Sequence, residues 1–399
     1  MVEEVMMKQT EIGLIPIDWE IAKFTAVFNF LSTASYSRAD LKENGEFGYI
    51  HYGDIHTKFH FHIDVENKLS GFITKEQLKT YSKIEKGDLI MADASEDYQG
   101  IGKAIEVLNV GENQYIISGL HTFLIRDKIK NTFALGFKGY FQNNPLIKKQ
   151  YDALATGLKV FSLSKGSFKN IQIPIPPLPE QEAIAEALGD CDAWIVGIEH
   201  LLAKKRLIKQ GAMQELLTPK EDWEVKKLGE VCLILNNLRI PIKESSRIKG
   251  EIPYYGANGV QGYVEGFTHN GEFVLIAEDG ANDLNNYPIN YVNGKIWVNN
   301  HAHVLQGIIS ILGTRFLSYL LKSVDFKSVL VGGTRAKLNK SILEKIEFSF
   351  PSLPEQTRIA TILSDMDAEL EALGKKLGKA RMIKQGMMQE LLTGRVRLV

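Results

Sequence analysis

The sequence predicts an α+β protein in which two mixed α/β domains are joined by two long helices, all within one internally duplicated chain. The tetrapeptide LPEQ occurs at 178–181 and again at 353–356, and MQELLT occurs at 213–218 and again at 388–393. Both repeats have the same offset, so one long segment is present twice with different sequence between the copies. The repeated segments have helical periodicity, whereas the intervening segments contain short strand-like runs. A chain of 399 residues is also too long for one ordinary core.

Composition excludes several classes of protein. Apolar residues make up 44% of the chain and charged residues 24%, as in ordinary globular proteins. The longest apolar runs, such as 308–312, are far shorter than a membrane span, and the acidic start lacks the features of a signal peptide. Two cysteines, Cys191 and Cys232, cannot form a disulfide framework or a cysteine-rich zinc site. We therefore expect a cytoplasmic protein with reduced thiols and no membrane association.

The first domain is expected over residues 1–177. It begins with IPIDWE at 15–20, and its later part is helical over 135–154. Glycine, asparagine and aspartate separate its strand-like runs, which are EFGYIHYGDI at 46–55, GDLIMAD at 87–93, AIEVL at 104–108 and QYIISGLHTFLI at 114–125.

The repeated segments, 178–218 and 353–399, each predict a helix of about 35 residues, or roughly 50 Å. A proline precedes each helix and a glutamate follows it, which suits the positive end of the helix dipole. Apolar residues alternate at spacings of four and three, which predicts a coiled-coil seam between the copies rather than separate packing into two domains. The seam positions are Ile184, Leu188, Cys191, Ile195, Ile198 and Leu202, matched by Ile359, Leu363, Met366, Leu370, Leu373 and Leu377.

The second domain is expected over residues 219–352, where the DWE motif returns at 222–224. It is helical over 315–323, and its strand-like runs lie at 251–267, 271–280 and 295–306. Each of the two intervening segments, 21–177 and 225–352, carries three more basic than acidic residues in a chain of net charge −1. This excess indicates polyanion binding, although chance variation on a mixed surface explains it equally well.

Motifs of catalysis are missing from the sequence. GIGKA at 100–104 lacks the remainder of a P-loop, and there is no H-E-x-x-H, G-x-S-x-G or dinucleotide fingerprint. His60 and His62 are expected on one face of a strand, as are His301 and His303. A metal site there lacks a carboxylate or cysteine at matching spacing. Partly buried imidazoles with satisfied hydrogen bonds are favoured, ahead of a polar binding face.

These motifs resemble those of the specificity subunits of type I restriction–modification enzymes. The resemblance covers nearly the whole chain, and its most specific part is the duplicated frame with a proline-LPEQ helix start. The matching phrases are PPLPEQ at 176–181, PSLPEQ at 351–356, both MQELLT segments, GRVRL at 394–398, IPIDWE at 15–20, HYGDI at 51–55, KGDLIMA at 86–92 and IPYYGANGVQGY at 252–263 with VLIAEDGA at 274–281.

The resemblance implies that each variable segment is a target-recognition domain that binds one half of a split double-stranded DNA site. The two long helices would pair as an antiparallel coiled coil and set the spacing of the half-sites. Two methylase subunits would bind this frame and methylate adenines with S-adenosylmethionine. Motor-nuclease subunits, where present, would use ATP and Mg²⁺. The chain itself would be non-catalytic, with no cofactor or metal, and its duplication would match a two-part site that need not be palindromic.

Sequence-specific contacts require Arg, Lys, Asn or Gln on exposed loops. In the second domain the candidates are Asn258 and Gln261 in GANGVQG, and Arg335, Lys337 and Lys340 in GGTRAKLNK. In the first domain they are Arg38, Lys58, His60 and Lys159. The alternative for each is a solvated side chain or a phosphate contact without sequence preference. The frame residues Leu178, Gln181, Leu353 and Gln356 are expected to hold helix starts rather than a ligand.

Two other functions remain open at this stage. One is a nuclease or methyltransferase with an unrecognised site, against which the missing motifs argue. The other is a coiled-coil scaffold that binds protein or RNA partners without recognising a DNA sequence, and the repeat is compatible with it.

Overall fold

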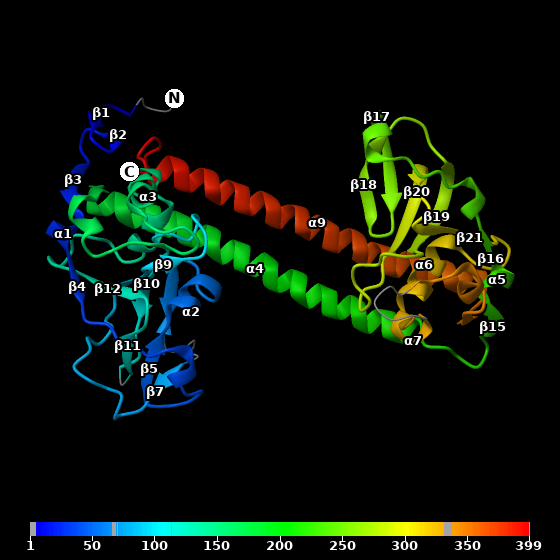
Figure 1. The fold of residues 1–399 in the computed structure, drawn as a ribbon, viewed down its shortest axis with the longest axis horizontal. Helices are drawn as coiled ribbons and strands as arrows, with labels where there is room; N and C mark the ends of the chain where they lie inside the picture. The colour runs from blue at the N-terminus through cyan, green and yellow to red at the C-terminus, as the bar shows by residue number, and fades with distance from the viewer. Residues whose placement is uncertain (1–4, 66–68, 70, 113, 331–336, 399) are drawn as a thin grey trace. The chain divides into compact units, whose positions relative to one another are not determined.

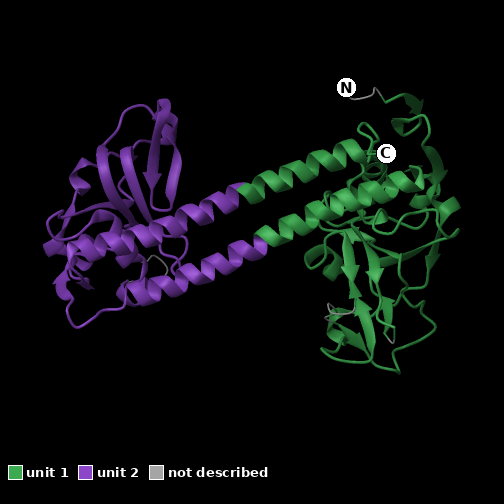
Figure 2. Cartoon of the chain, turned by 180° about the vertical axis from the view of Figure 1, so that it is seen from behind, with its two compact units in different colours: residues 1–198, 376–399 green, residues 199–375 purple. Residues whose placement is uncertain are grey.

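The chain forms two compact units, each combining one α/β domain with half of both long helices (Figures 1 and 2). Unit 1 contains residues 1–198 and 376–399, and unit 2 contains residues 199–375. The α+β class with two mixed domains and two long helices is confirmed. The computed structural model describes residues 5–65, 69, 71–112, 114–330 and 337–398.

The domain of unit 1 is built on a five-stranded sheet with the strand order β4-β12-β8-β10-β6. The β6 strand runs parallel to β10, and the other neighbours are antiparallel. The central strand β8 is buried along its whole length, which explains its purely apolar sequence LIMA. The bounds are β4 Phe28–Leu31, β6 His62–Asp64, β8 Leu89–Ala92, β10 Ala104–Asn109 and β12 Thr122–Asp127.

Shorter elements surround this sheet. A second sheet has the order β11-β5-β7, and the hairpin β1-β2 and the pair β13-β9 stand apart from it. The remaining bounds in this domain are β1 Met7–Thr10, β2 Gly13–Pro16, α1 Phe24–Val27, β5 Phe47–Ile50, α2 Tyr52–Thr57, β7 Phe72–Ile73, β9 Ala94–Ser95, β11 Tyr115–Ser118, η3 Lys138–Asn143, α3 Pro145–Leu154 and β13 Phe161–Ser162.

The domain of unit 2 repeats the main sheet of unit 1. Its order is β16-β21-β19-β20-β17-β18, and β17 runs parallel to β20, as β6 does to β10. The additional strand β18 completes a hairpin with β17. The bounds are β16 Cys232–Ile234, β17 Lys249–Gly256, β18 Gly259–Val264, β19 His269–Ala277, β20 Ile289–Val298, β21 Ala302–Gly307, α5 Leu228–Val231, α6 Thr314–Lys322, α7 Phe326–Val329 and α8 Lys340–Leu343.

A two-stranded ladder closes each domain where it meets its helix. In unit 1, β3 (Glu20–Lys23) pairs with β14 (Gln172–Ile175). In unit 2, β15 (Glu224–Lys227) pairs with β22 (Glu347–Phe350) in the same register. The strand that follows DWE therefore lies against the strand that precedes LPEQ, which explains why both motifs recur together.

The long helices α4 (Leu178–Leu216) and α9 (Leu353–Leu391) have 39 residues each, longer than the predicted 35. Each begins one residue before its proline, because a proline in the first turn lacks only an amide hydrogen that would be unbonded there. The helices run antiparallel within each unit: Cys191 contacts Met387 in unit 1, and Lys205 contacts Glu369 in unit 2.

The apolar seam is buried most deeply where it meets the domains. Ile184 and Leu188 join the core of unit 1, and Ile359 and Leu363 join the core of unit 2. The same seam therefore contributes both to the contact between the helices and to the cores of the domains, so the two predicted alternatives are not exclusive.

The prediction of a strand over residues 46–55 is correct for β5 but wrong for its second half, because Tyr52–Thr57 form the helix α2. The ring of His51 accepts a hydrogen bond from the amide of Gly53, and the carboxylate of Asp54 accepts one from the amide of His51. This local capping stabilises a helix start inside a sequence with strand-like composition.

Candidate nucleic-acid interface

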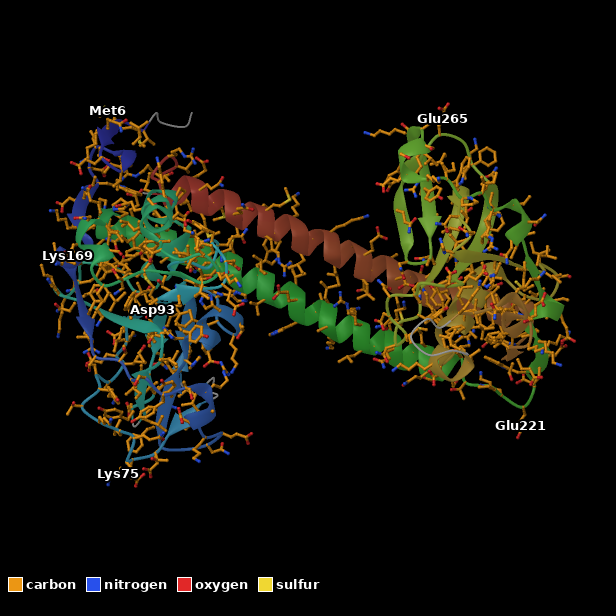
Figure 3. The ribbon with its side chains drawn as sticks, in the orientation of Figure 1. Met6, Lys75, Asp93, Lys169, Glu221 and Glu265 are labelled. Atoms are coloured by element: carbon orange, nitrogen blue, oxygen red, sulfur yellow. The ribbon has the colours of Figure 1, made fainter. Side chains whose placement is uncertain are left out.

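The end of the central strand is fixed by the same backbone hydrogen bond in both units. In unit 1, the amide of Asp93, directly after β8, donates to the carbonyl of His121 at 3.1 Å. In unit 2, the amide of Glu278, directly after β19, donates to the carbonyl of His301 at 2.9 Å. Asp93 is labelled in Figure 3. Most of the predicted contact residues lie around these two strand ends.

Arg38 and Lys58 share one carboxylate in unit 1. The Arg38 guanidinium lies 3.1 Å and the Lys58 ammonium 2.8 Å from Oδ1 of Asp54, which is only 4% exposed. Burial opposes ionisation of Asp54, but the two cations outweigh it and lower the pKa of its carboxyl. The cations remain 55% and 39% exposed, so a buried anion positions two cations that still face solvent.

An aromatic cluster on α2 joins these cations to the strand end. The ring of Tyr52 packs against the rings of His51, His56 and His121, with centroid distances of 4.5, 6.3 and 5.4 Å. Nε2 of His56 is 2.9 Å from the carbonyl oxygen of Ala94, beside Asp93. The cluster fixes the position of α2 against the end of β8.

His60 and Lys159 lie apart from the shared carboxylate. His60 lines a cavity of about 510 Å³ that is also lined by Gln385 and Gln389 of α9. Lys159 is exposed in the connection before β13, and β13 pairs with β9, directly after Asp93. Lys159 therefore belongs to the same end of the domain, whereas His60 lies beside the helical frame.

The β17–β18 hairpin of unit 2 carries Asn258 and Gln261. Nδ2 of Asn258 donates to the carbonyl of Gly280 at 2.9 Å, and its Oδ1 accepts from the amide of Asn282 at 3.0 Å. Oε1 of Gln261 accepts from Nδ2 of Asn299 at 3.4 Å. Both ends of the Asn258 amide are thus engaged within the protein, and Asn258 ties the hairpin to the connection after β19.

In unit 2, the carboxylate of Glu278 contacts several basic side chains. Its carboxylate lies 2.7 Å from Arg239, 3.2 Å from Lys337 and 3.6 Å from Nδ1 of His303. Burial opposes ionisation of Glu278, but these neighbours, Arg239 first, outweigh it and lower its pKa. Lys340 pairs instead with Glu344 along α8, at 3.6 Å. The predicted contact residue Arg335 lies outside the described residues.

In each unit, two of the predicted residues therefore contact a shared group, but the shared group differs between the units. Arg38 and Lys58 meet at Asp54, while Asn258 and Lys337 both contact the connection that follows β19. That any of the nine predicted residues touches DNA stays a prediction. Sequence reasoning missed Asp93 and His121 and, in unit 2, Arg239 and Asp279, whereas it named His301 only as a neighbour of His303 on one strand face. The available signal was a strand ending in alanine and followed by an acidic residue, IMAD and LIAED, but the paired histidine comes only after one or more further strands.

The expectation that each histidine pair shares one strand face is wrong, because His60 precedes β6 and His301 precedes β21. His62 begins β6 and its Nε2 lies 2.7 Å from the carbonyl oxygen of Gly136, whereas His60 precedes the strand and is exposed. His303 is buried, with its ring nitrogens bonded to Asn236 and to the carbonyl of Leu338. Satisfied imidazoles are thus confirmed for His62 and His303. Within the described ranges, no group of three His, Cys, Asp or Glu side chains could hold a metal ion.

Comparison with known proteins decides the family. The model of the family described as "Type I restriction modification DNA specificity domain" matches residues 16–210 and 220–378. The chain belongs to this family. The two matches coincide with the two copies of the repeat, so both domains are specificity domains of the type I family, and the resemblance noted from the sequence is confirmed.

Two curated relatives and two solved structures support this assignment. A putative type I restriction enzyme specificity subunit of Haemophilus influenzae is 49% identical over 39% of this chain and 40% of its own length. A Methanocaldococcus jannaschii subunit is 25% identical over 99% of this chain and 98% of its own. The S subunit structure from M. genitalium has a TM-score of 0.63 at 17% identity, covering 94% of this chain and 96% of that one. A structure described as showing complex assembly of the type I system has a TM-score of 0.54 at 16% identity, covering 96% of this chain and 99% of that one.

These structural similarities show the fold of a specificity subunit. In the described part of the chain, every helix is too short or too polar to span a lipid bilayer.

Proposed function

We propose that this chain is the DNA-recognition subunit of a type I restriction–modification complex and that each domain recognises one half of a split site. The observation that carries the proposal is the repetition of one sheet topology with different exposed side chains at the same strand end. The end of β8 presents Arg38, Lys58 and a histidine–tyrosine cluster. At the end of β19, Lys337 and Asn258 are exposed, whereas Arg239 is only 14% exposed and pairs with Glu278. One geometry with two surfaces suits two different half-sites.

The helices α4 and α9 are proposed to bind two methylase subunits and to set the spacing of the half-sites. Their outer faces are largely exposed and carry mixed charge, as expected for protein contacts. The chain is proposed to be non-catalytic. S-adenosylmethionine, ATP and Mg²⁺ would then be bound by the methylase and motor-nuclease subunits.

The test is to map methylated adenines in the source genome with and without this gene. We expect one split motif, with two short specified halves around a fixed gap, to disappear on deletion. Exchange of residues 21–177 for those of another family member should then change only one half. If no motif changes while the methylase subunits are expressed, the recognition function is rejected in favour of a scaffold for protein or RNA partners.

A further inference from the structure

A histidine–aspartate pair recurs at the strand end of both domains. In unit 1, Nδ1 of His121 lies 3.1 Å from Oδ1 of Asp93. In unit 2, Nδ1 of His301 lies 2.5 Å from Oδ1 of Asp279. Each histidine directly precedes the strand that pairs with the central strand, β12 in unit 1 and β21 in unit 2. The two pairs therefore occupy equivalent places in the two sheets.

The pair is retained although the acidic residue comes from a different backbone position. Asp93 is the first residue after β8, but Asp279 is the second residue after β19. The residue of unit 2 that is equivalent to Asp93 by its backbone hydrogen bond is Glu278, and its carboxylate binds Arg239 and Lys337 instead. If the pair were only inherited from the duplication, the aspartate would be expected at the same position after the central strand in both domains. Recurrence from shifted positions indicates that the pair itself is functional.

The arrangement leaves one nitrogen of each imidazole available to a ligand. The aspartate accepts the hydrogen bond of Nδ1, which fixes the orientation of the ring. Among the described residues, Nε2 of His121 and Nε2 of His301 have no hydrogen-bond partner, and the two side chains are 53% and 50% exposed. His121 also has a φ of 54°, a strained conformation for a residue other than glycine, and such strain concentrates at functional sites.

A neighbouring side chain lies beside each pair, an aromatic ring in unit 1 and a cation in unit 2. The Tyr52 ring packs on His121 from α2, which also positions Lys58. Nη1 of Arg239 donates to the carbonyls of Asn300 and Ala302 on either side of His301. An imidazole that donates Nδ1–H to the aspartate can donate from Nε2 as well only when both ring nitrogens carry a hydrogen. A phosphate oxygen at Nε2 and the carboxylate at Nδ1 would together favour that form, with a charge-assisted hydrogen bond at each nitrogen.

We propose that His121 and His301 each donate a hydrogen bond from Nε2 to a backbone phosphate of the bound duplex, one in each half-site. This inference rests on the proposed DNA-recognition function. The domains are proposed to bind different base sequences, so an element common to both must contact what the half-sites share, and the phosphodiester backbone is common to every sequence. The pair would fix the register of each domain on the duplex, and the surrounding side chains would recognise the bases.

The test uses the full-length chain purified with its methylase subunits. Binding is measured by fluorescence anisotropy on a duplex with the split motif found by methylation mapping and on one with both halves scrambled. The variants are His121→Gln, His301→Gln and the double variant, and glutamine keeps a neutral donor near Nε2. The control is Glu112→Gln, at an exposed position between β10 and β11 that is given no role in binding. Thermal unfolding curves establish that the variants are folded.

We expect each single variant to weaken binding to both duplexes by a similar factor, about 3-fold to 10-fold. The slope of log affinity against log salt concentration should fall by about 0.9 for each lost charged contact. Glu112→Gln should change neither quantity. Weakening only on the specific duplex would show a base contact and overturn the proposal, as would wild-type affinity and an unchanged salt slope in the double variant. Failure of the wild-type complex to prefer the split motif would instead reject the DNA-recognition function, and this inference with it.

Discussion

The ammonium of Lys384 on α9 is hydrogen-bonded to the carboxylate of Asp192 on α4, and the phenol of Tyr140 donates to the same carboxylate at 2.9 Å. Unit 2 contains the same arrangement with the helices exchanged, since Lys209 of α4 binds Asp367 of α9 and Tyr319 donates to that carboxylate at 2.8 Å. In each unit, this triad of lysine, aspartate and tyrosine therefore links the domain to both long helices. Lys209 and Lys384 occupy the same position in the two copies of the repeat, so the attachment is duplicated with the helices.

Replacing the two lysines should have unequal effects. In the triad of unit 1, Lys384 is 6% exposed and Asp192 30%, whereas Lys209 and Asp367 are 15% and 42% exposed. Lys384→Ala leaves a carboxylate unpaired in a more buried place, so we expect a loss of about 3 kcal/mol in unfolding free energy. Lys209→Ala should cost about 1 kcal/mol because solvent screens Asp367. Urea unfolding measures both, with exposed Lys379→Ala as the control. Equal losses would contradict this explanation.

The glutamine of each LPEQ motif fastens the helix start to its domain. Gln181 accepts a hydrogen bond from the amide of Ala134 and donates to the carbonyls of Thr132 and Pro176. It is fully buried, so Gln181→Ala should leave backbone groups without partners and cost about 2 to 3 kcal/mol. Hydrogen exchange at the amide of Ala134 should accelerate. The exposed neighbour Glu182→Ala is the control, and unchanged exchange in Gln181→Ala would reject the role assigned to the glutamine.

The two long helices and their LPEQ starts could be predicted from the sequence because side chains of repeated residues make the contacts that hold them. Gln356 makes the equivalent three hydrogen bonds, to the amide of Gly313 and the carbonyls of Ile311 and Pro351. The expectation that these glutamines hold helix starts is confirmed. By contrast, the domain groups that bind these glutamines are backbone amides and carbonyls, so the side chains at those positions are free to differ. This is why the common sheet topology of the two domains has almost no signal in the sequence.

The candidate site was less predictable for a related reason. Arg38 and Lys58 were identified as exposed cations, but the Asp54 carboxylate that positions them lies in a segment expected to be a strand. The carboxylates of Asp93 and Asp279 take equivalent places from positions one residue apart along their connections, which no fixed spacing could reveal. Local capping and long-range contacts decide these features.

The two helix starts should respond differently to the loss of an arginine. Arg397 binds the buried Glu180 and also both carboxylate oxygens of Asp18, at 2.9 and 2.8 Å, while Trp19 donates to Glu180 at 2.8 Å. Arg397→Ala should therefore leave a buried carboxylate held only by Trp19 and cost about 2 kcal/mol. Thermal unfolding monitored by tryptophan fluorescence checks the loss.

The matched control lies at the start of the other helix. Glu355, the repeat equivalent of Glu180, pairs with Arg358 one turn along α9, and the two side chains are 28% and 56% exposed. Arg358→Ala should leave the unfolding midpoint unchanged. A shift in Arg358→Ala as large as that in Arg397→Ala would show that general charge balance, rather than the buried contact, sets the stability.

The buried carboxyl of Glu106 should make unit 1 less stable as the pH rises. Burial raises its pKa from 4.5 to about 7, and the Lys138 ammonium 3.9 Å away opposes this only in part. Oε2 accepts a hydrogen bond from the amide of Gly139, whereas Oε1 has no hydrogen-bond partner among the described residues. The folded state therefore binds a proton that the unfolded state releases between pH 4.5 and 7, and stability is lost as pH rises through this range.

Glu106→Gln removes this titration while keeping the shape and the bond to Gly139. The difference in unfolding free energy between pH 5 and pH 8 should become smaller than in the wild type by about 2 kcal/mol, with the variant the more stable protein at pH 8. Urea unfolding across this range measures the change, and the exposed Glu112→Gln should keep the wild-type profile. A variant profile parallel to that of the wild type would mean that Glu106 is already ionised at pH 5, so that Lys138 outweighs burial.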